Sequence, residues 1–296
     1  MNKENSLEED VHHGTADRPI AALHFAAGEG TVYPNGFFVE RHWHHSIEIL
    51  KVLKGSYTVE LNLENHTLET GDICMINSGE LHQIEGNEKT GRHDVIIFNP
   101  HILQFSYHDE FQDTLVEPLL SHQYSLPHII HPQSRGHAAL SALFDQVVSL
   151  QDTKQEDWYF SCKLLMLDML NQFKKNELLI PSASIQTETE KEKIDRYKRI
   201  VSYIQEHFMD KVTLEQLAEV ARCNSQYLCH FFKDIAEVSP IQYLIAYRIE
   251  RAQDMLKDST KTVLEISLDC GFENVSYFIR QFKRAVGETP RQYRVK

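Results

Sequence analysis

A chain of 296 residues with a net charge of −13 is long enough to form two domains, each with its own hydrophobic core. Its 42% hydrophobic and 25% charged residues are typical of a globular protein, and its longest apolar stretch, residues 164–170, is interrupted by Asp168, which excludes a membrane-spanning helix. The polar, acidic start indicates no secretory or transit signal, and five scattered cysteines without a CxxC motif exclude a disulfide framework, so we expect a cytoplasmic protein without a membrane partner.

The N-terminal part of the chain has the pattern of a small β domain. Residues 1–18 are polar and acidic, and we expect a disordered tail there. Residues 19–110 contain short runs rich in β-branched residues, such as IEILKVL, YTVELNL, DICMI and DVIIF. Closely spaced short strands of this kind predict an antiparallel barrel or sandwich.

The most unusual segment of this domain is HWHHSIEILKVLKG, residues 42–55, which is rich in histidine. On a single strand, residues separated by an even number of positions point to the same face. We therefore expect His42, His44 and Glu48 on one face and His45 on the other.

The spacing in this region resembles the motifs of the cupin family. The first motif is matched at every signature position, and a second motif is matched in part, with asparagine where proline is usual: Gly36, His42, His44, Glu48 and Gly55, then Gly71, Asn77, Gly79 and His82. The resemblance implies a cupin-like ligand-binding domain in which His42, His44, Glu48 and His82 hold a divalent metal such as Mn, Fe, Ni or Zn. The same four side chains could instead bind a small polar molecule directly by hydrogen bonds.

Helical periodicity follows the β domain. Apolar residues spaced by three and four predict helices over residues 137–151 and 158–173, the second with Trp158, Leu164 and Met169 on its apolar face. We interpret residues 111–175 as a helical dimerisation segment, although the two helices could instead simply cover the core of their own domain. The polar, aperiodic residues 176–192 predict a linker.

Charge divides the chain at nearly the same place. Residues 191–296 hold 18 basic and 15 acidic residues, whereas the remainder of the chain holds 12 and 28. The C-terminal part is slightly basic despite the acidic total, so its charge permits a nucleic-acid partner.

Residues 193–296 contain an internal repeat with a shift of 50 residues. Nine residues recur without gaps: Leu214/Leu264, Glu215/Glu265, Asn224/Asn274, Tyr227/Tyr277, Phe232/Phe282, Lys233/Lys283, Pro240/Pro290, Gln242/Gln292 and Tyr243/Tyr293. Each copy predicts a helix, a tight turn and a second helix, with Thr213, Asn224 and Asn274 as N-caps and Gly271 in the second turn. The pattern is that of two helix-turn-helix units.

The second helix of each unit has an apolar stripe, in which we include Tyr227 and Tyr277, and an outer face near its N-terminus. We expect the outer-face residues and the nearby basic residues to contact DNA: Ser225, Gln226, Cys229, His230, Lys233, Val275, Ser276, Ile279, Arg280, Lys283 and Arg284. Arg280 can bind guanine O6 and N7 with two hydrogen bonds, and the lysines can contact phosphates.

A helix is also predicted between the two units, from the cap Ser239 to about Lys257. Some 17 residues at 1.5 Å each give roughly 26 Å. A helix of this length could place two recognition helices in successive major grooves, about 34 Å apart.

The segments YRIERAQDMLKDS, GFENVSYFIRQFKR and GETPRQYR closely resemble the AraC-type DNA-binding domain, and the resemblance covers about the last hundred residues. Glu237, where glycine is usual, and Ser267, where alanine is usual, depart from the family pattern. The resemblance implies a bacterial transcription regulator that binds double-stranded promoter DNA, works with RNA polymerase and senses a signal through its N-terminal domain. Few basic residues surround the cupin-like motif, which favours a neutral, sugar-like effector over an anion.

Together these patterns predict an α+β chain of two domains, with a cupin-like antiparallel β-barrel followed by helices, and a C-terminal all-α domain with two helix-turn-helix units. We expect a homodimeric DNA-binding regulator that is not an enzyme and requires no cofactor. Two alternatives keep a metal at His42, His44, Glu48 and His82: a metal-dependent cupin enzyme and a metal-sensing regulator.

Overall fold

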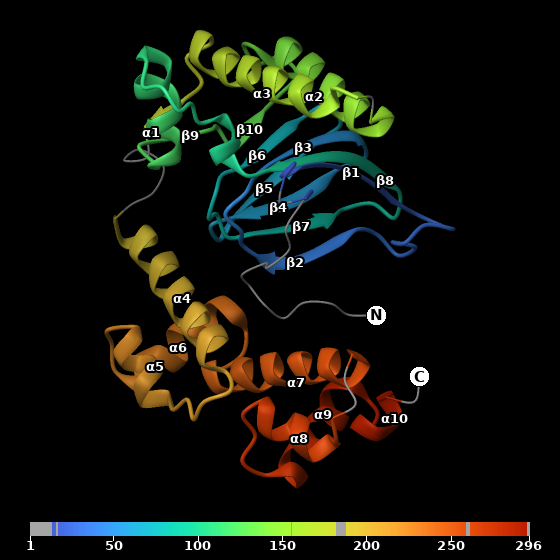
Figure 1. The fold of residues 1–296 in the computed structure, drawn as a ribbon, viewed down its shortest axis with the longest axis vertical. Helices are drawn as coiled ribbons and strands as arrows, with labels where there is room; N and C mark the ends of the chain where they lie inside the picture. Colours follow the sequence, from blue (N-terminus) through green and yellow to red (C-terminus); the bar gives the residue numbers. More distant parts are fainter. Residues whose placement is uncertain (1–13, 16, 155, 182–187, 259–260, 295–296) are drawn as a thin grey trace. The chain divides into compact units, whose positions relative to one another are not determined.

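The computed structural model describes residues 14–15, 17–154, 156–181, 188–258 and 261–294 (Figure 1). The chain divides into two compact units that meet in sequence at Glu190 and Lys191. Most of the expected tail, residues 1–18, and residues 182–187 of the expected linker lie outside the described residues. Among the helices of the described ranges, none is both long and apolar enough to cross a membrane.

Two antiparallel sheets form the β domain of the N-terminal unit. One sheet has the strand order β1-β8-β3-β6-β10 and the other has the order β2-β7-β4-β5. The strands of the first sheet are β1 (Ile20–Ala27), β3 (Ile47–Lys54), β6 (Ile73–Ile76), β8 (Gly91–Phe98) and β10 (Ile129–Ile130). The strands of the second are β2 (Phe38–His42), β4 (Tyr57–Leu61), β5 (Glu64–Leu68) and β7 (His82–Gly86). The antiparallel β domain expected from the sequence is confirmed.

Strand β3 shows why a nearly continuous apolar run suits this architecture. Alternate residues of a strand point to opposite faces. Leu50 joins a core between the two sheets, whereas Ile47 and Ile49 join a second core against the helices. Both faces of β3 are therefore buried, and both need apolar side chains.

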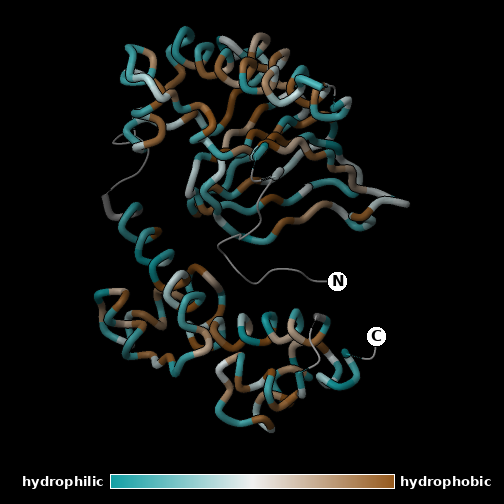
Figure 2. The backbone as a smooth tube through the Cα atoms, viewed as in Figure 1, coloured by the Kyte–Doolittle hydropathy of each residue, from teal (hydrophilic) through white to brown (hydrophobic). Residues whose placement is uncertain are grey.

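Helices α2 (His137–Thr153) and α3 (Trp158–Lys175) lie across the outer face of the five-stranded sheet (Figure 1). In Figure 2, hydrophobic stretches of the strands lie beneath these helices, whose outward turns are hydrophilic. The two helices thus cover the core of their own unit.

The apolar face of α3 differs from expectation at Leu164, which is 52% exposed. The buried stripe runs instead through Trp158, Cys162 and Met166, since residues four apart share one face of a helix. Phe160, at 64% exposure, and Leu164 remain as apolar side chains on the outer surface of α3.

A run of short elements lies between the β domain and α2: η1 (Pro100–Leu103), η2 (Gln112–Val116), α1 (Glu117–Leu120) and β9 (Tyr124–Ser125). Strand β9 pairs with β11 (Ile180–Pro181), which follows α3. The start of the expected linker, up to Pro181, is therefore hydrogen-bonded to the N-terminal unit.

The C-terminal unit is entirely helical in the residues that the structure describes. Its helices are α4 (Glu188–His207), α5 (Leu214–Val220), α6 (Ser225–Ala236), α7 (Pro240–Asp258), α8 (Val263–Asp269), α9 (Val275–Val286) and α10 (Pro290–Arg294). Helices α5 and α6 form the first helix-turn-helix unit, α8 and α9 form the second, and α7 joins them (Figure 1). The predicted fold class is confirmed in both domains.

The sequence separation between the two helix-turn-helix units is not the same for their first helices as for their second helices. The caps of α6 and α9, Asn224 and Asn274, are 50 residues apart, whereas the caps of α5 and α8, Thr213 and Thr262, are 49 apart. The buried pairs agree with the shift of 49: Leu217 and Ala218 of α5, and Ile266 and Ser267 of α8. Two of the expected pairs, Leu214/Leu264 and Glu215/Glu265, are therefore wrong.

The turn of the second unit is longer by one residue, and this accounts for the difference. Arg222 and Gly271 end the first helices with positive φ angles of 52° and 76°. Each donates its N–H to the carbonyl three residues earlier, on Glu219 and Leu268. An alignment without gaps misses this insertion, because the extra residue lies between the first helices and the second helices, which each align without gaps.

Candidate DNA-binding helices and histidine cluster

All of the residues expected to contact DNA lie on α6 or α9, and none of them is buried. Beneath them, α6 buries Leu228 and Phe232, and α9 buries Phe278 and Phe282. Each second helix therefore packs one face into the unit and leaves the predicted outer face open to solvent.

Asn224 and Asn274 determine where these two helices begin. The side-chain oxygen of each accepts a hydrogen bond from the N–H three residues later, at 2.8 Å from Tyr227 and 2.9 Å from Tyr277. An asparagine cap contributes about 1 kcal/mol to helix stability. Both caps confirm the predicted starts of the helices.

The tyrosine after each cap is placed differently in the two units. Tyr227 is 44% exposed, so its assignment to the apolar stripe is wrong; it packs against Arg196, whose guanidinium carbon lies 5.7 Å from the ring centroid. Tyr277 is partly buried, and the guanidinium carbon of Arg280 lies 5.3 Å from its ring centroid. This cation–π contact restricts Arg280 on the exposed side of α9.

Arg248 of α7, which the sequence patterns did not single out, links the segment that precedes the first helix-turn-helix unit to the turn of the second unit. It donates from Nε to the carbonyl of Phe208 and from Nη2 to that of Asp210, both at 2.7 Å. Its guanidinium carbon also lies 5.6 Å from the ring centroid of Phe272, and burial lowers the pKa of Arg248. An arginine on the inner face of a predicted helix is the signal that could have identified it.

Gly271 allows the same segments to meet closely. A Cβ atom at this position would lie 2.4 Å from the carbonyl oxygen of Phe208. The turn of the second unit is thus packed on the segment that precedes the first unit.

In the N-terminal unit, the structure brings together the four residues of the cupin-like motif, but not on one strand as expected. His42 is the last residue of β2, where the pairing with β7 is irregular, and His44 lies in the connection 43–46 between the two sheets. Glu48 lies on β3, and His82 is the first residue of β7. The four side chains therefore do meet, but because tertiary packing brings different elements together, and not because they alternate along one strand.

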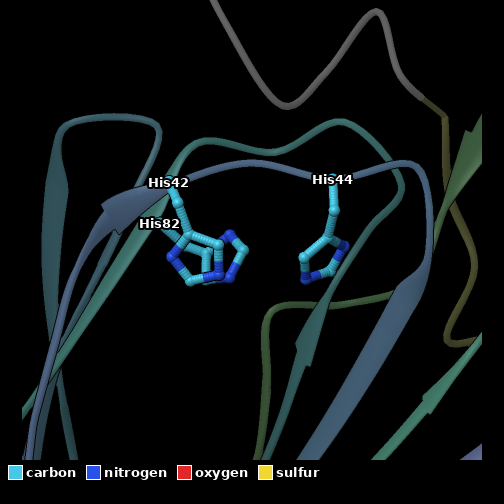
Figure 3. A group of neighbouring side chains, drawn as sticks. All are labelled: His42, His44 and His82. Atoms are coloured by element: carbon cyan, nitrogen blue, oxygen red, sulfur yellow. The ribbon is translucent and has the colours of Figure 1, made fainter. Parts of the chain in front are cut away.

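One ring nitrogen from each of His42, His44 and His82 lies within 4.8 Å of the others (Figure 3). Glu48 Oε2 lies 3.4 Å from His44 Nε2 and 3.6 Å from His82 Nε2. His44, Glu48 and His82 are buried, with exposures of 4%, 5% and 0%. His45 is exposed outside this cluster, as predicted.

The backbone determines which nitrogen of each ring carries the proton. The Nδ1 atoms of His42, His44 and His82 lie 2.9, 3.1 and 2.9 Å from the carbonyl oxygens of Glu40, Ser46 and Glu80. Carbonyl oxygens only accept hydrogen bonds, so each Nδ1 is protonated and Nε2 is the lone-pair nitrogen of the neutral ring.

This arrangement gathers acceptors at one point. Burial raises the pKa of Glu48, but the neighbouring rings of His44 and His82 outweigh it and lower the pKa of the carboxyl group. Nε2 of a neutral His44 ring and an oxygen of the Glu48 carboxylate are both acceptors, so at 3.4 Å they repel each other unless a proton or a cation lies between them. Added protons, the hydroxyl donors of a bound molecule or one divalent metal ion would each relieve this repulsion.

The donor set fits a metal ion. Imidazole and carboxylate groups suit Zn, Mn, Fe and Ni, and metal-bound histidines commonly donate their second ring N–H to a carbonyl, as all three do here. His42, His44, His82 and Glu48 would hold the ion.

A family model described as a helix-turn-helix domain matches residues 217–296, and one described as a cupin domain matches residues 28–97. The chain is 27% identical to an HTH-type transcriptional regulator of Bacillus subtilis, YdeC, over 98% of this chain and 97% of that protein. It is 24% identical to the HTH-type transcriptional activator RhaS of Escherichia fergusonii, over 88% and 89% of the two chains. A solved structure of the DNA-binding domain of AdpA with a target DNA is 28% identical, with a TM-score of 0.33, and covers 34% of this chain and 90% of that one.

Proposed function

This chain is an AraC-family transcriptional regulator, in which a cupin domain precedes an AraC-type helix-turn-helix domain, and from this we propose that a small molecule bound in the cupin domain controls its contact with promoter DNA. The observation that carries the proposal is the pair of exposed helix faces on α6 and α9, held in one packed unit that follows a domain with a buried polar cluster.

The proposed DNA contact uses α6 and α9 as recognition helices. The joining helix α7 has 19 residues, or roughly 28 Å at 1.5 Å per residue, which suits adjacent major grooves about 34 Å apart. Arg280 and His230 would face base edges, whereas Lys233, Lys283 and Arg284 would face phosphates.

The first candidate for the regulatory molecule is a neutral, sugar-like ligand at His42, His44, Glu48 and His82. Hydroxyl groups can donate to the inward Nε2 atoms and to the carboxylate of Glu48, so a polyol would supply the donors that the cluster lacks. Binding controls DNA affinity only if the ligand prefers one arrangement of the protein over the other.

A second candidate is regulation by a divalent metal at the same four residues. It is favoured by the three Nδ1 contacts to carbonyl oxygens, which orient every Nε2 lone pair toward one point. The metal would add a Lewis-acidic centre to the cluster. We propose a binding role rather than catalysis, in keeping with relatives that are named as regulators over nearly their whole length.

The partners follow from this role. The proposed partners are promoter DNA and RNA polymerase, and a protein with these partners works in the cytoplasm. The exposed Phe160 and Leu164 of α3 offer an apolar contact for a homodimer. These assignments support the proposal that two subunits present their recognition helices to neighbouring sites.

Titration of the full-length protein with DNA from its own upstream region, over a range of salt concentrations, tests the regulatory role. We expect the logarithm of affinity to fall linearly with the logarithm of salt, with a slope of about 0.9 per phosphate contact. Affinity that depends on neither salt nor DNA sequence would refute the proposal.

Metal analysis separates the two candidates for the barrel. Metal regulation predicts about one ion per purified chain, its loss in His82→Ala, and its retention in His108→Ala, which alters an exposed histidine elsewhere. It also predicts that DNA affinity changes when the metal is removed with a chelator. A metal-free protein with unchanged DNA affinity would leave the sugar-like ligand as the candidate.

A further inference from the structure

A pocket of about 170 Å³ lies outside the barrel, at the end of the five-stranded sheet. Its walls come from the connection 43–46, the turn 77–78, η1 and the segment 119–125. It shares no residue with the cluster of His42, His44, Glu48 and His82. His45, which points away from that cluster, lines this pocket instead.

The pocket has an apolar floor and a polar rim. Ile47 and Leu119, which are 2% and 7% exposed, form part of the floor. The rim carries His45, His101 and His122. A molecule in this pocket would therefore contact hydrocarbon on one side and imidazole rings on the other.

The charge of the lining selects among ligands. Its ionisable side chains are three imidazoles and the phenol of Tyr124, and no carboxylate, lysine or arginine is among the residues that line it in the described structure. An amine meets no carboxylate among these described lining residues, whereas a carboxylate can accept hydrogen bonds from imidazole N–H groups. Glu80, the acid nearest in sequence to the turn 77–78, is paired with His128 at 2.9 Å.

The size of the pocket limits the ligand further. At about 30 Å³ per water molecule, the pocket has the volume of five or six waters. This volume suits an acid with a short hydrocarbon chain rather than a sugar phosphate or a nucleotide.

Hydrogen bonds join the walls of the pocket to one another. Gly79 N donates to the carbonyl of His44, and Ser78 Oγ donates to that of His45, both at 2.8 Å. Asn77 Nδ2 donates to Leu126 O at 3.1 Å, and Leu126 N donates to Asn77 Oδ1 at 2.8 Å. The turn at residues 77–79 thus links the histidine connection to the segment that carries β9.

The pocket also contacts the strand pair at the end of the N-terminal unit. Tyr124 and Ser125 line the pocket and form β9, which pairs with Ile180 and Pro181 of β11. Pro181 is the last described residue before α4, which begins the helical unit. A ligand in the pocket therefore touches both the connection that carries His44 and the strand pair from which the chain leaves for the DNA-binding unit.

We propose that this pocket is a regulatory site for a small carboxylic acid, with its carboxylate held by His45, His101 and His122 and its hydrocarbon chain packed on Ile47 and Leu119. The inference rests on the proposed regulatory function but assigns a site distinct from the barrel cluster. Asn99 helps to place His101, because its side-chain oxygen accepts a hydrogen bond from the backbone N–H of His101 at 3.0 Å.

Propionate, butyrate and hexanoate, each with its amide and its amine as matched probes, test the proposal by calorimetric titration and thermal unfolding of the full-length protein. At least one acid is expected to bind saturably and to raise Tm with concentration, as expected for a ligand that binds only the folded state. The amide is expected to bind about tenfold more weakly or worse, because a hydrogen bond to a charged group contributes more than a neutral one.

The variants His101→Ala and His122→Ala are each expected to weaken acid binding by about tenfold or more. His108→Ala, at an exposed histidine that does not line the pocket, is the matched control and is expected to bind as the wild type does. Absence of binding by every acid, equal binding of acid, amide and amine, or full binding by both His101→Ala and His122→Ala would each overturn the proposal.

The same preparations, titrated with promoter DNA with and without the acid, separate this proposal from the function on which it rests. A change in DNA affinity that disappears in His101→Ala supports the regulatory site. Salt-dependent DNA binding with no acid binding overturns the pocket alone, whereas acid binding without any specific DNA binding overturns the proposed function.

Discussion

Arg280 and His230 occupy equivalent places on the two recognition helices, yet their surroundings differ. Arg280 lies over the ring of Tyr277, whereas Tyr227 of the first unit packs against Arg196. A side chain that is already restricted loses less conformational entropy on binding. We therefore expect the second unit to contribute more base discrimination than the first.

Replacing Arg280 with alanine is predicted to weaken operator binding by about 1–3 kcal/mol and to relax the base preference at one position. His230→Ala, at the equivalent place in α6, is the matched variant and should have a smaller effect. Affinities of both proteins for operators with single base changes provide the measurement. Unchanged preference in Arg280→Ala would contradict the role of its guanidinium.

His93 shows how one buried residue can make stability depend on pH. It is 1% exposed and stacks on Phe25, with ring centroids 5.0 Å apart. Within the described residues, neither of its ring nitrogens has a hydrogen-bond partner. Burial lowers the pKa of His93 to about 4, so the folded protein holds this ring neutral.

Between pH 6.5 and 4 the unfolded chain binds a proton at His93 that the folded protein does not bind, so the free energy of unfolding is expected to fall as the pH decreases through this range. The full effect is roughly 3 kcal/mol, at 1.36 kcal/mol per pKa unit. His93→Phe is predicted to remove this part of the pH dependence, which urea denaturation at several pH values measures. An identical pH dependence in the variant would show that His93 is not the cause.

At the scale of elements, helices α6 and α9 both end in a left-handed residue, but this residue differs between the two helices. Helix α6 ends at Glu237 with a φ of 61°, and α9 ends at Gly287 with a φ of 87°. Left-handed backbone is unfavourable for any residue with a Cβ atom and easy for glycine. Glutamate at position 237, where glycine is usual in the family, therefore strains the backbone. The sequence comparison could suggest this strain, and the φ angle shows that it lies at the end of α6.

Glu237→Gly is predicted to raise the free energy of unfolding by about 0.5–1 kcal/mol, since relief of backbone strain exceeds the added freedom of the unfolded chain. The mirror variant Gly287→Ala should lower it by about 1 kcal/mol, because nothing lies within 4 Å of an added Cβ and only the φ angle opposes it. Chemical denaturation of both variants measures these changes. Equal effects of the same sign at the two sites would contradict this account.

The two first helices illustrate a second limit at this scale. Caps and helix starts follow from short sequence signals, so Thr213, Asn224 and Asn274 could be predicted directly. The correspondence between α5 and α8 depends on how each turn closes. Only the backbone at Arg222 and Gly271 reveals that the second turn has one more residue.

At the scale of the whole molecule, the two parts of the chain differ in net charge. Residues 1–190, which include the N-terminal unit, hold 16 more acidic than basic residues, and residues 191–296 hold three more basic than acidic ones. Each unit also has its own buried core. DNA affinity and ligand response should therefore be separable.

A fragment of residues 188–296 is predicted to retain the operator preference of the full chain but to bind more weakly, because the avidity of the proposed dimer is lost. It should also show no change in DNA affinity on addition of a metal, a sugar or a small acid. DNA titrations of the fragment beside the full-length protein measure both properties. A fragment that still responds to one of these ligands would place that ligand's site in the C-terminal unit.

The sequence by itself determined the two domains, the β and helical classes, the helix caps and the four residues of the barrel cluster, because these depend on local periodicity, on short capping signals and on motif spacing. Only the tertiary structure decided that His44 and His82 meet Glu48 from different elements, that Arg248 links residues 208–210 to the turn of the second helix-turn-helix unit, and that Leu164 and Tyr227 are exposed. The pocket beside His45 is another feature that only the tertiary structure decided. Its walls come from segments up to about 80 residues apart, and no local pattern encodes a contact between residues that only folding brings together.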